Sequence, residues 1–195
     1  MTHTKKNRVS NRRTFKNNDY KSNDGMLTSI WGPPLWHVLH SMSFNYPVNP
    51  TLEDKKHYRE FIINLKWTLP CGKCRTNLVN NFKKLPLKNE HMKSRSTFSK
   101  YVYDLHELIN KMLGKSSGLT YQDVRERYEH FRSRCVETDE DKLKLLQELK
   151  TENGCVKPLY GKKSKCIMKI VPDDTKCNSL EIDDKCIIKT IVDDK

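Results

Sequence analysis

Leu69-Pro70-Cys71-Gly72-Lys73-Cys74 is the stretch that decides the fold, because it places two cysteines two residues apart where a helix is predicted to begin. A pair at this spacing can close into a small disulfide and open again. At a helix N-terminus the peptide dipoles and free N–H groups favour thiolate, the attacking species in disulfide exchange. Lys73 and Arg75 add positive charge in the same direction. The stretch therefore predicts a redox-active pair.

Three other interpretations of this pair remain open from the residues alone. Half of a zinc site would need two more soft ligands, but there is no second CxxC, and His91 is the only nearby histidine downstream. A thioredoxin-like fold would need strands around the motif, whereas both flanks have helical patterns. The third interpretation is two inert buried cysteines at a chance spacing. We expect the redox pair and no bound metal.

Apolar residues at helical spacing predict an all-α core on both sides of the pair. The predicted helices cover residues 31–46, 52–67, 71–82 and 97–113, and a fifth begins after Thr120, which can cap it. Pro33 and Pro34 suit the first turn of the first helix, and residues 85–96 are expected to form a loop. The expected architecture is a four-helix bundle plus a short fifth helix.

The two ends of the chain differ in composition from this core. Residues 1–25 are expected to be a disordered basic arm, and within residues 1–23 Lys and Arg greatly outnumber the single acid, Asp19. Together with the net charge of +13, the arm also permits contact with nucleic acid. Residues 26–136 form the predicted domain, and residues 137–195 form an extension that opens with a further helix over 139–150.

The extension contains a short repeat. Residues 165–174, 176–184 and 185–194 each place a cysteine before a β-prone run and end in paired aspartates. Units this short cannot bury a core, so we expect a flexible or strand-forming extension. Seven cysteines in a chain without an apolar leader do not describe a secreted disulfide scaffold. The sequence also lacks an apolar run of about 18 residues, so no membrane span is expected.

Two aromatic or imidazole pairs accompany the CxxC. His40 follows Trp36 by one helical turn, and Asn110 follows His106 by one turn, so each pair shares a helix face. A single histidine on an apolar face is more often a satisfied core residue. Both pairs together with the cysteines predict a site that holds a flat redox cofactor.

These residues, in this order and at these separations, resemble the Erv/ALR family of FAD-linked sulfhydryl oxidases, particularly its compact branch from large DNA viruses. The resemblance covers roughly residues 29–134. The motifs that carry it are Trp31-Gly32, Trp36, His40, Tyr46-Pro47, Cys71-x-x-Cys74, His106-x-x-Ile109-Asn110, Leu113 and Lys115.

The resemblance implies a helical bundle that holds FAD beside the cysteine pair. Cys74 would be the sulfur next to the flavin, and Cys71 would exchange with the incoming dithiol. The residues implied to line the FAD pocket are Gly32, Trp36, His40, Tyr46, His106, Asn110, Lys115 and Tyr128. Electrons would pass from substrate dithiols through the pair to FAD and then to O2, giving H2O2.

Partners and location also follow from the resemblance. It implies protein dithiol substrates or a thioredoxin-like carrier, and a homodimer is common in the family. It places the protein in the host cytoplasm or the virion, with the mitochondrial intermembrane space as the alternative. A different class of function also fits the composition: a basic nucleic-acid-binding or virion structural protein with cross-linking or zinc-binding cysteines.

The chain departs from the family pattern at several positions. Glu107 replaces the usual asparagine after the family histidine. Tyr121 stands where many relatives have the first cysteine of a structural disulfide, so that disulfide is expected to be absent, and Cys135 has no obvious partner. Some relatives use a second, mobile cysteine pair. The candidates here are Cys155, Cys166, Cys177 and Cys186.

Overall fold

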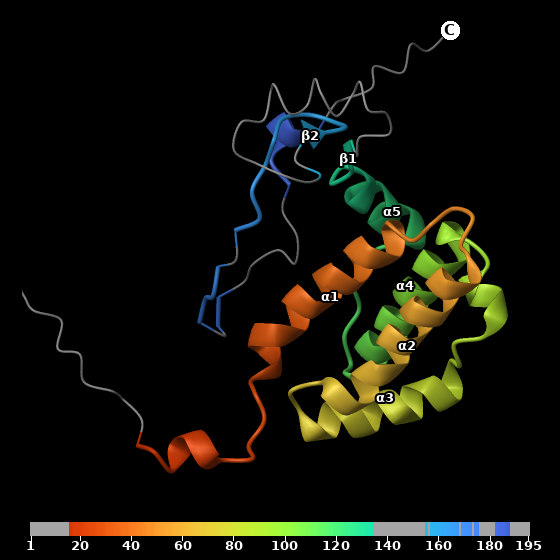
Figure 1. The fold of residues 1–195 in the computed structure, drawn as a ribbon. Helices are drawn as coiled ribbons and strands as arrows, with labels where there is room; N and C mark the ends of the chain where they lie inside the picture. The colour runs from red at the N-terminus through yellow and green to blue at the C-terminus, as the bar shows by residue number, and fades with distance from the viewer. Residues whose placement is uncertain are drawn as a thin grey trace, which may run out of the picture.

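The computed structural model describes residues 16–134, 155, 157–167, 169–172, 174–175 and 182–187. Within these residues the molecule is a helical bundle (Figure 1). Its α-helices are α1 (Thr28–Phe44), α2 (Leu52–Thr68), α3 (Gly72–Lys84), α4 (Arg95–Met112) and α5 (Tyr121–Glu129). The first four form the bundle, and α5 packs against α1 and α4. The predicted fold class is confirmed.

The remaining elements of the described residues are short. They are the 3-10 turns η1 (Asp19–Lys21), η2 (Asn89–Met92) and η3 (Asp184–Cys186), and the strands β1 (Ser133–Arg134) and β2 (Lys157–Pro158). The two strands pair antiparallel, with Ser133 opposite Pro158. The strand β2 lies before the predicted repeats, so the expectation of a flexible or strand-forming extension over these repeats stays a prediction. The arm up to residue 15 and the predicted helix over 139–150 lie outside the described residues.

Capping residues explain where three of the helices begin. The capping box joins a side-chain oxygen before the helix to the backbone three residues later, and the return bond satisfies a second free N–H. The boxes are Thr51 with Asp54 at α2, Ser94 with Thr97 at α4, and Thr120 with Asp123 at α5. The prediction that Thr120 caps the fifth helix is confirmed.

The start of α1 was predicted wrongly. The helix begins at Thr28, so Pro33 and Pro34 lie in its second turn, not its first. Proline leaves the carbonyl four residues earlier without its helical N–H partner. Here those carbonyls belong to Ser29 and Ile30, which lie on the exposed surface, where water can satisfy them.

The core centres on α4. Phe98, Tyr101, Val102 and Leu105 follow one another at helical spacing, and each is at most 3% exposed. This stripe packs with α1, α2 and α3 residues in one hydrophobic cluster. Because the stripe fixes the rotation of α4, it also fixes the direction of His106, the next residue along the helix.

Contacts of Tyr121 hold α5 against α1 and α4. The Tyr121 hydroxyl lies 2.9 Å from the Ser99 hydroxyl of α4, and its ring stacks on Phe44 of α1 at 6.2 Å between centroids. Tyr103 of α4 also touches the Tyr121 ring, edge on, at 5.8 Å. The tyrosine thus fastens α5 at the position where relatives were expected to use a cysteine.

Candidate active site

The cysteine pair is a disulfide at the N-terminus of α3. Cys71 is the N-cap residue, and its sulfur accepts a hydrogen bond from the Cys74 amide at 3.2 Å. The two residues are bonded through their sulfurs, with 5.2 Å between Cα atoms, and both are half-buried. When the disulfide is open, the same amide and the helix dipole stabilise thiolate at Cys71.

The segment before α1 lies directly on this disulfide. The Met26 amide donates to the Pro70 carbonyl at 2.8 Å. A Cβ on Gly25 would lie 2.9 Å from that carbonyl and 3.2 Å from the Cys71 Cα, so this close approach requires glycine. The Thr28 hydroxyl lies 3.7 Å from the Cys74 sulfur. The first residue of α1 therefore lies beside the Cys74 sulfur.

A stripe leads along α1 away from Cys74. Thr28, Gly32, Trp36 and His40 follow at intervals of four residues and so share one face of the helix. At a rise of 1.5 Å per residue, the stripe is about 18 Å long. The Trp36 indole stacks on the His106 ring of α4, with centroids 3.9 Å apart and planes 7° apart. The structure thus places three predicted site residues, Gly32, Trp36 and His40, on the helix face that begins beside Cys74, and stacks a fourth, His106, on Trp36.

The two histidines are paired. His40 Nε2 lies 3.0 Å from His106 Nδ1, across 66 positions of sequence. Burial, together with repulsion from His106 and His37, lowers the pKa of His40 to about 3. Burial also lowers the pKa of His106 to about 4, against the opposing effect of Glu107. Both imidazoles are therefore neutral at physiological pH, and one donates to the other.

The other predicted residues lie at different distances from this pair. The Tyr128 ring is 5.3 Å from that of His40, and burial raises the pKa of its hydroxyl. The Asn110 side chain donates through Nδ2 to Glu107 Oε1 at 3.0 Å. The Asn110 backbone carbonyl accepts a hydrogen bond from the backbone amide of the exposed Lys115 at 2.8 Å. Glu107, which departs from the family pattern, therefore acts on the site through Asn110, because its carboxylate accepts the hydrogen bond of that side chain.

Tyr46 is placed in the core. Its side chain is completely buried, donates to the Met92 carbonyl at 3.0 Å and packs against Tyr58 and Phe98. In this position it fixes the turn that follows α1. Its predicted contact with a cofactor stays a prediction.

Two neighbours of the site were missed. His37 Nδ1 lies 3.2 Å from the Tyr128 hydroxyl, and Phe44 stacks on the Tyr128 ring at 5.3 Å. Their spacing of seven residues, two helical turns, is the signal that places both on the side of α1 that meets α5.

The residues present fit a flat heteroaromatic group. His40 Nδ1 is buried and, among the described residues, has no hydrogen-bond partner. Whichever ring donates in the imidazole pair, this nitrogen is left with an unused donor or acceptor. A Cβ on Gly32 would meet only the Thr28 methyl within 4 Å, at 3.5 Å. Space at Gly32, aromatic faces at Trp36 and a free nitrogen at His40 suit a ring with polar edges.

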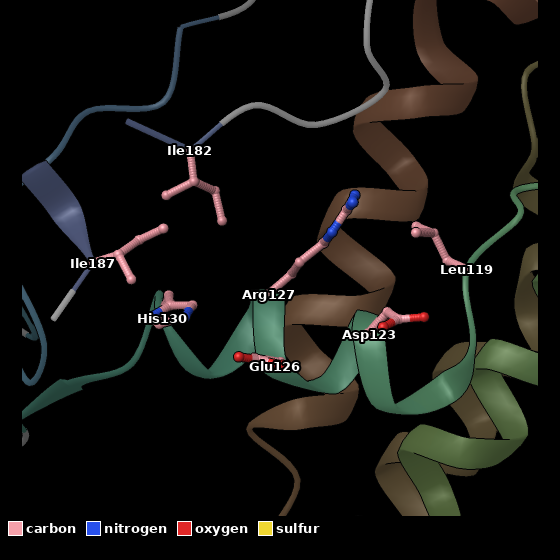
Figure 2. A pocket seen from close by; sticks show the side chains of 7 residues that line it. All are labelled: Leu119, Asp123, Glu126, Arg127, His130, Ile182 and Ile187. Carbon is pink, nitrogen blue, oxygen red and sulfur yellow. The ribbon is translucent and has the colours of Figure 1, made fainter. Parts of the chain in front are cut away.

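A separate hollow lies on the other side of α5. Its volume is about 340 Å³, and it opens between α5 and the segment around η3 (Figure 2). The side chains that line it are Leu119, Asp123, Glu126, Arg127, His130, Ile182 and Ile187. None of the predicted site residues lines it, so it is not the cofactor site that the sequence predicts.

The cysteines of the extension are in different states. Cys166 is free and exposed, and Cys186 is free and half-buried, whereas Cys155 is disulfide-bonded. Cys135 and Cys177 lie outside the described residues. A mobile second pair among these cysteines stays a prediction.

Acidification is expected to destabilise the folded chain through the imidazole pair. His40 and His106 bind protons more weakly in the folded chain than in the unfolded chain. The two rings make their full contribution to the free energy of unfolding above about pH 6.5. Toward pH 4 this free energy falls by up to about 1.4 kcal/mol per pH unit for each ring. In thermal melts between pH 7 and pH 4.5, His40→Phe should show a shallower pH dependence than wild type. An unchanged slope in His40→Phe would contradict the assignment.

A bundle that carries a CxxC disulfide beside an aromatic and imidazole stripe defines a thiol–disulfide oxidoreductase. The particular family follows from comparison with known proteins. The chain belongs to the Erv1/Alr family, whose family model matches residues 33–129.

Curated relatives agree with this assignment. The chain is 39% identical over 104 residues to the probable FAD-linked sulfhydryl oxidase R368 of Acanthamoeba polyphaga mimivirus, covering 53% of this chain and 72% of the relative. It is 30% identical over 90 residues to the putative FAD-linked sulfhydryl oxidase 347L of Invertebrate iridescent virus 6, covering 44% and 81%. The yeast Erv1 core aligns at 21% identity over 62% of this chain and 94% of that chain, with a TM-score of 0.48. The relatives favour the oxidase over the basic structural protein.

Proposed function

We propose that this Erv1/Alr protein, an FAD-linked sulfhydryl oxidase, forms disulfide bonds in other proteins through Cys71 and Cys74. The observation that carries the proposal is the position of the disulfide. It lies at the N-terminus of α3, and Cys74 Sγ is 3.7 Å from the first residue of the α1 stripe. One sulfur therefore faces the predicted cofactor site, which leaves the other for the substrate.

The exchange at the pair needs only the substrate dithiol and the Cys71–Cys74 disulfide. A substrate thiolate attacks Cys71 Sγ, the Cys71–Cys74 bond breaks, and Cys74 leaves as thiolate. The second substrate thiolate then attacks the first substrate sulfur and releases Cys71. The substrate loses two electrons and becomes a disulfide, and the pair gains them as a dithiol. The α3 N-terminus stabilises the thiolate formed at this step.

The residues that would hold FAD are Gly32, Trp36, His40, Tyr46, His106, Asn110, Lys115 and Tyr128. Bound there, FAD would supply a two-electron acceptor that O2 reoxidises, giving H2O2. The neutral His40 and His106 offer hydrogen bonds without adding charge to the site. Burial of the pair by Trp36 and Tyr128 limits the access of water to it.

The substrates we propose are protein dithiols, reached directly or through a thioredoxin-like carrier. Ile30 and Val38 are exposed on α1, which supports a homodimer through this helix. The viral relatives support a location in the host cytoplasm or the virion. No helix in the part of the chain that the structure describes is long and apolar enough to cross a membrane.

The visible absorption spectrum of the purified chain tests the proposal. A flavin spectrum should bleach under anaerobic dithiothreitol and recover when air is admitted. A colourless protein that FAD does not reconstitute would contradict the proposal, and bound zinc in it would favour the structural alternative.

A further inference from the structure

Exposed apolar side chains flank the Cys71–Cys74 disulfide on both sides. Met26 and Leu27 are 69% and 73% exposed, and their segment is bonded to Pro70, the residue before Cys71. Trp67 is 69% exposed in the last turn of α2, four residues before Cys71. Neither the core nor the cofactor stripe uses these side chains. Large apolar groups exposed beside a reactive sulfur indicate a surface for contact with another chain.

The same surface is basic. Between Glu60 and Glu90 the sequence has six Lys and Arg residues and no acid. On α3 the exposed positions Lys73, Thr76, Asn80 and Lys83 recur at intervals of three and four, which forms one outward stripe. The stripe begins beside Cys71 and is about 15 Å long.

The charges near the disulfide are placed to meet a partner. Lys66 Nζ lies 5.2 Å from the centre of the Trp67 ring, so charge and apolar surface coincide there. The carboxylate in the flanking segment, Asp24, already accepts a hydrogen bond from Ser22. The surface is therefore complementary to a chain that is both acidic and apolar.

We propose that this docking surface, made of Met26, Leu27, Lys66, Trp67, Lys73 and Lys83, selects the substrates of the oxidase. The selected class is protein dithiols in which an apolar residue and acidic residues flank the attacking cysteine. An extended chain advances about 3.3 Å per residue, so a carboxylate within about five positions of that cysteine reaches the lysines of α3. The proposal rests on the proposed function, because it assigns the substrate of the same cysteine pair.

The test measures exchange at Cys71 without the flavin step. In the full-length Cys74→Ser variant, Cys71 thiolate attacks the sulfur of a peptide carried as a pyridyl disulfide. A Cys71–peptide bond forms, and pyridine-2-thione leaves and is recorded by absorbance. Two peptides differ only in having Asp or Lys beside the Leu-Cys unit. Neutral dipyridyl disulfide normalises the intrinsic reactivity of Cys71, and the Cys71→Ser/Cys74→Ser variant gives the background from other cysteines.

The acidic peptide should react about tenfold faster than the basic peptide at low salt, and the ratio should fall as salt is added. Lys66→Glu and Lys73→Glu should each lower this ratio about fivefold. Trp67→Ser should slow both peptides but not dipyridyl disulfide. Lys56→Glu, about 15 Å along α2 from Lys66, is the matched control and should keep the wild-type ratio.

Equal rates for the two peptides would overturn the proposal, as would an equal effect of Lys56→Glu. Self-association of the Cys74→Ser variant that Trp67→Ser abolishes would assign the surface to a second copy and also overturn it. Failure of the proposed function gives a different result: dithiothreitol would not bleach a flavin in wild type, whatever the peptide ratio in this assay.

Discussion

Replacing Cys74 with serine will give a yellow protein whose flavin dithiothreitol no longer bleaches. Cys71 keeps its place at the α3 N-cap, but as a lone thiol it offers reduced dithiothreitol no disulfide to attack, so no electrons pass through it to the flavin. Because the pair acts as a unit, we expect thiol-dependent O2 consumption to fall roughly a thousandfold or more. Stopped-flow absorbance under anaerobic dithiothreitol measures the bleaching, and an oxygen electrode measures turnover.

Cys166→Ser is the matched control for this variant. Cys166 is a free, exposed cysteine outside the bundle, so its replacement should leave both bleaching and dithiothreitol turnover at the wild-type level. Cys71→Ser should lose turnover as Cys74→Ser does, since either substitution removes the disulfide. Bleaching of Cys74→Ser at the wild-type rate would show that electrons enter the flavin without this pair.

Much of the bundle could be predicted because its helices carry local signals. Thr120 and Asp123 form a capping box within four residues of sequence, and the apolar stripe of α4 repeats at helical spacing. The first helix is different. Its start at Thr28 depends on the bond between Met26 and Pro70, which joins segments more than forty residues apart. A periodic pattern contains no information about such a contact.

In the candidate site, too, local spacing predicts some features and contacts between distant segments decide the others. Spacing placed Trp36 and His40 on one helix face and His106 on another, but only the packing of α1 on α4 brings the two imidazoles to 3.0 Å. Tyr46 was grouped with them by family resemblance, whereas the structure shows it buried against Phe98. His37 was missed because its partner, Tyr128, lies on α5, 91 residues further along the chain.

Gly32→Leu should separate cofactor binding from folding more cleanly than any other single change in the stripe. Glycine inside a helix costs about 1 kcal/mol relative to alanine, and a Cβ at Gly32 meets only the Thr28 methyl at 3.5 Å. The flavin-free chain should therefore keep its circular dichroism spectrum and melt at or above the wild-type temperature. The leucine would occupy the space beside Trp36, so FAD affinity should fall at least about tenfold.

Two measurements make this outcome specific. FAD should raise the melting temperature of wild type, because a ligand that binds only the folded state stabilises it, and this rise should be lost in Gly32→Leu. Val38→Leu is the matched control, because Val38 is 47% exposed on another face of the same helix, and its FAD content should equal that of wild type. If Gly32→Leu kept a full complement of flavin, the face of α1 that begins at Thr28 would not be the face that holds the cofactor.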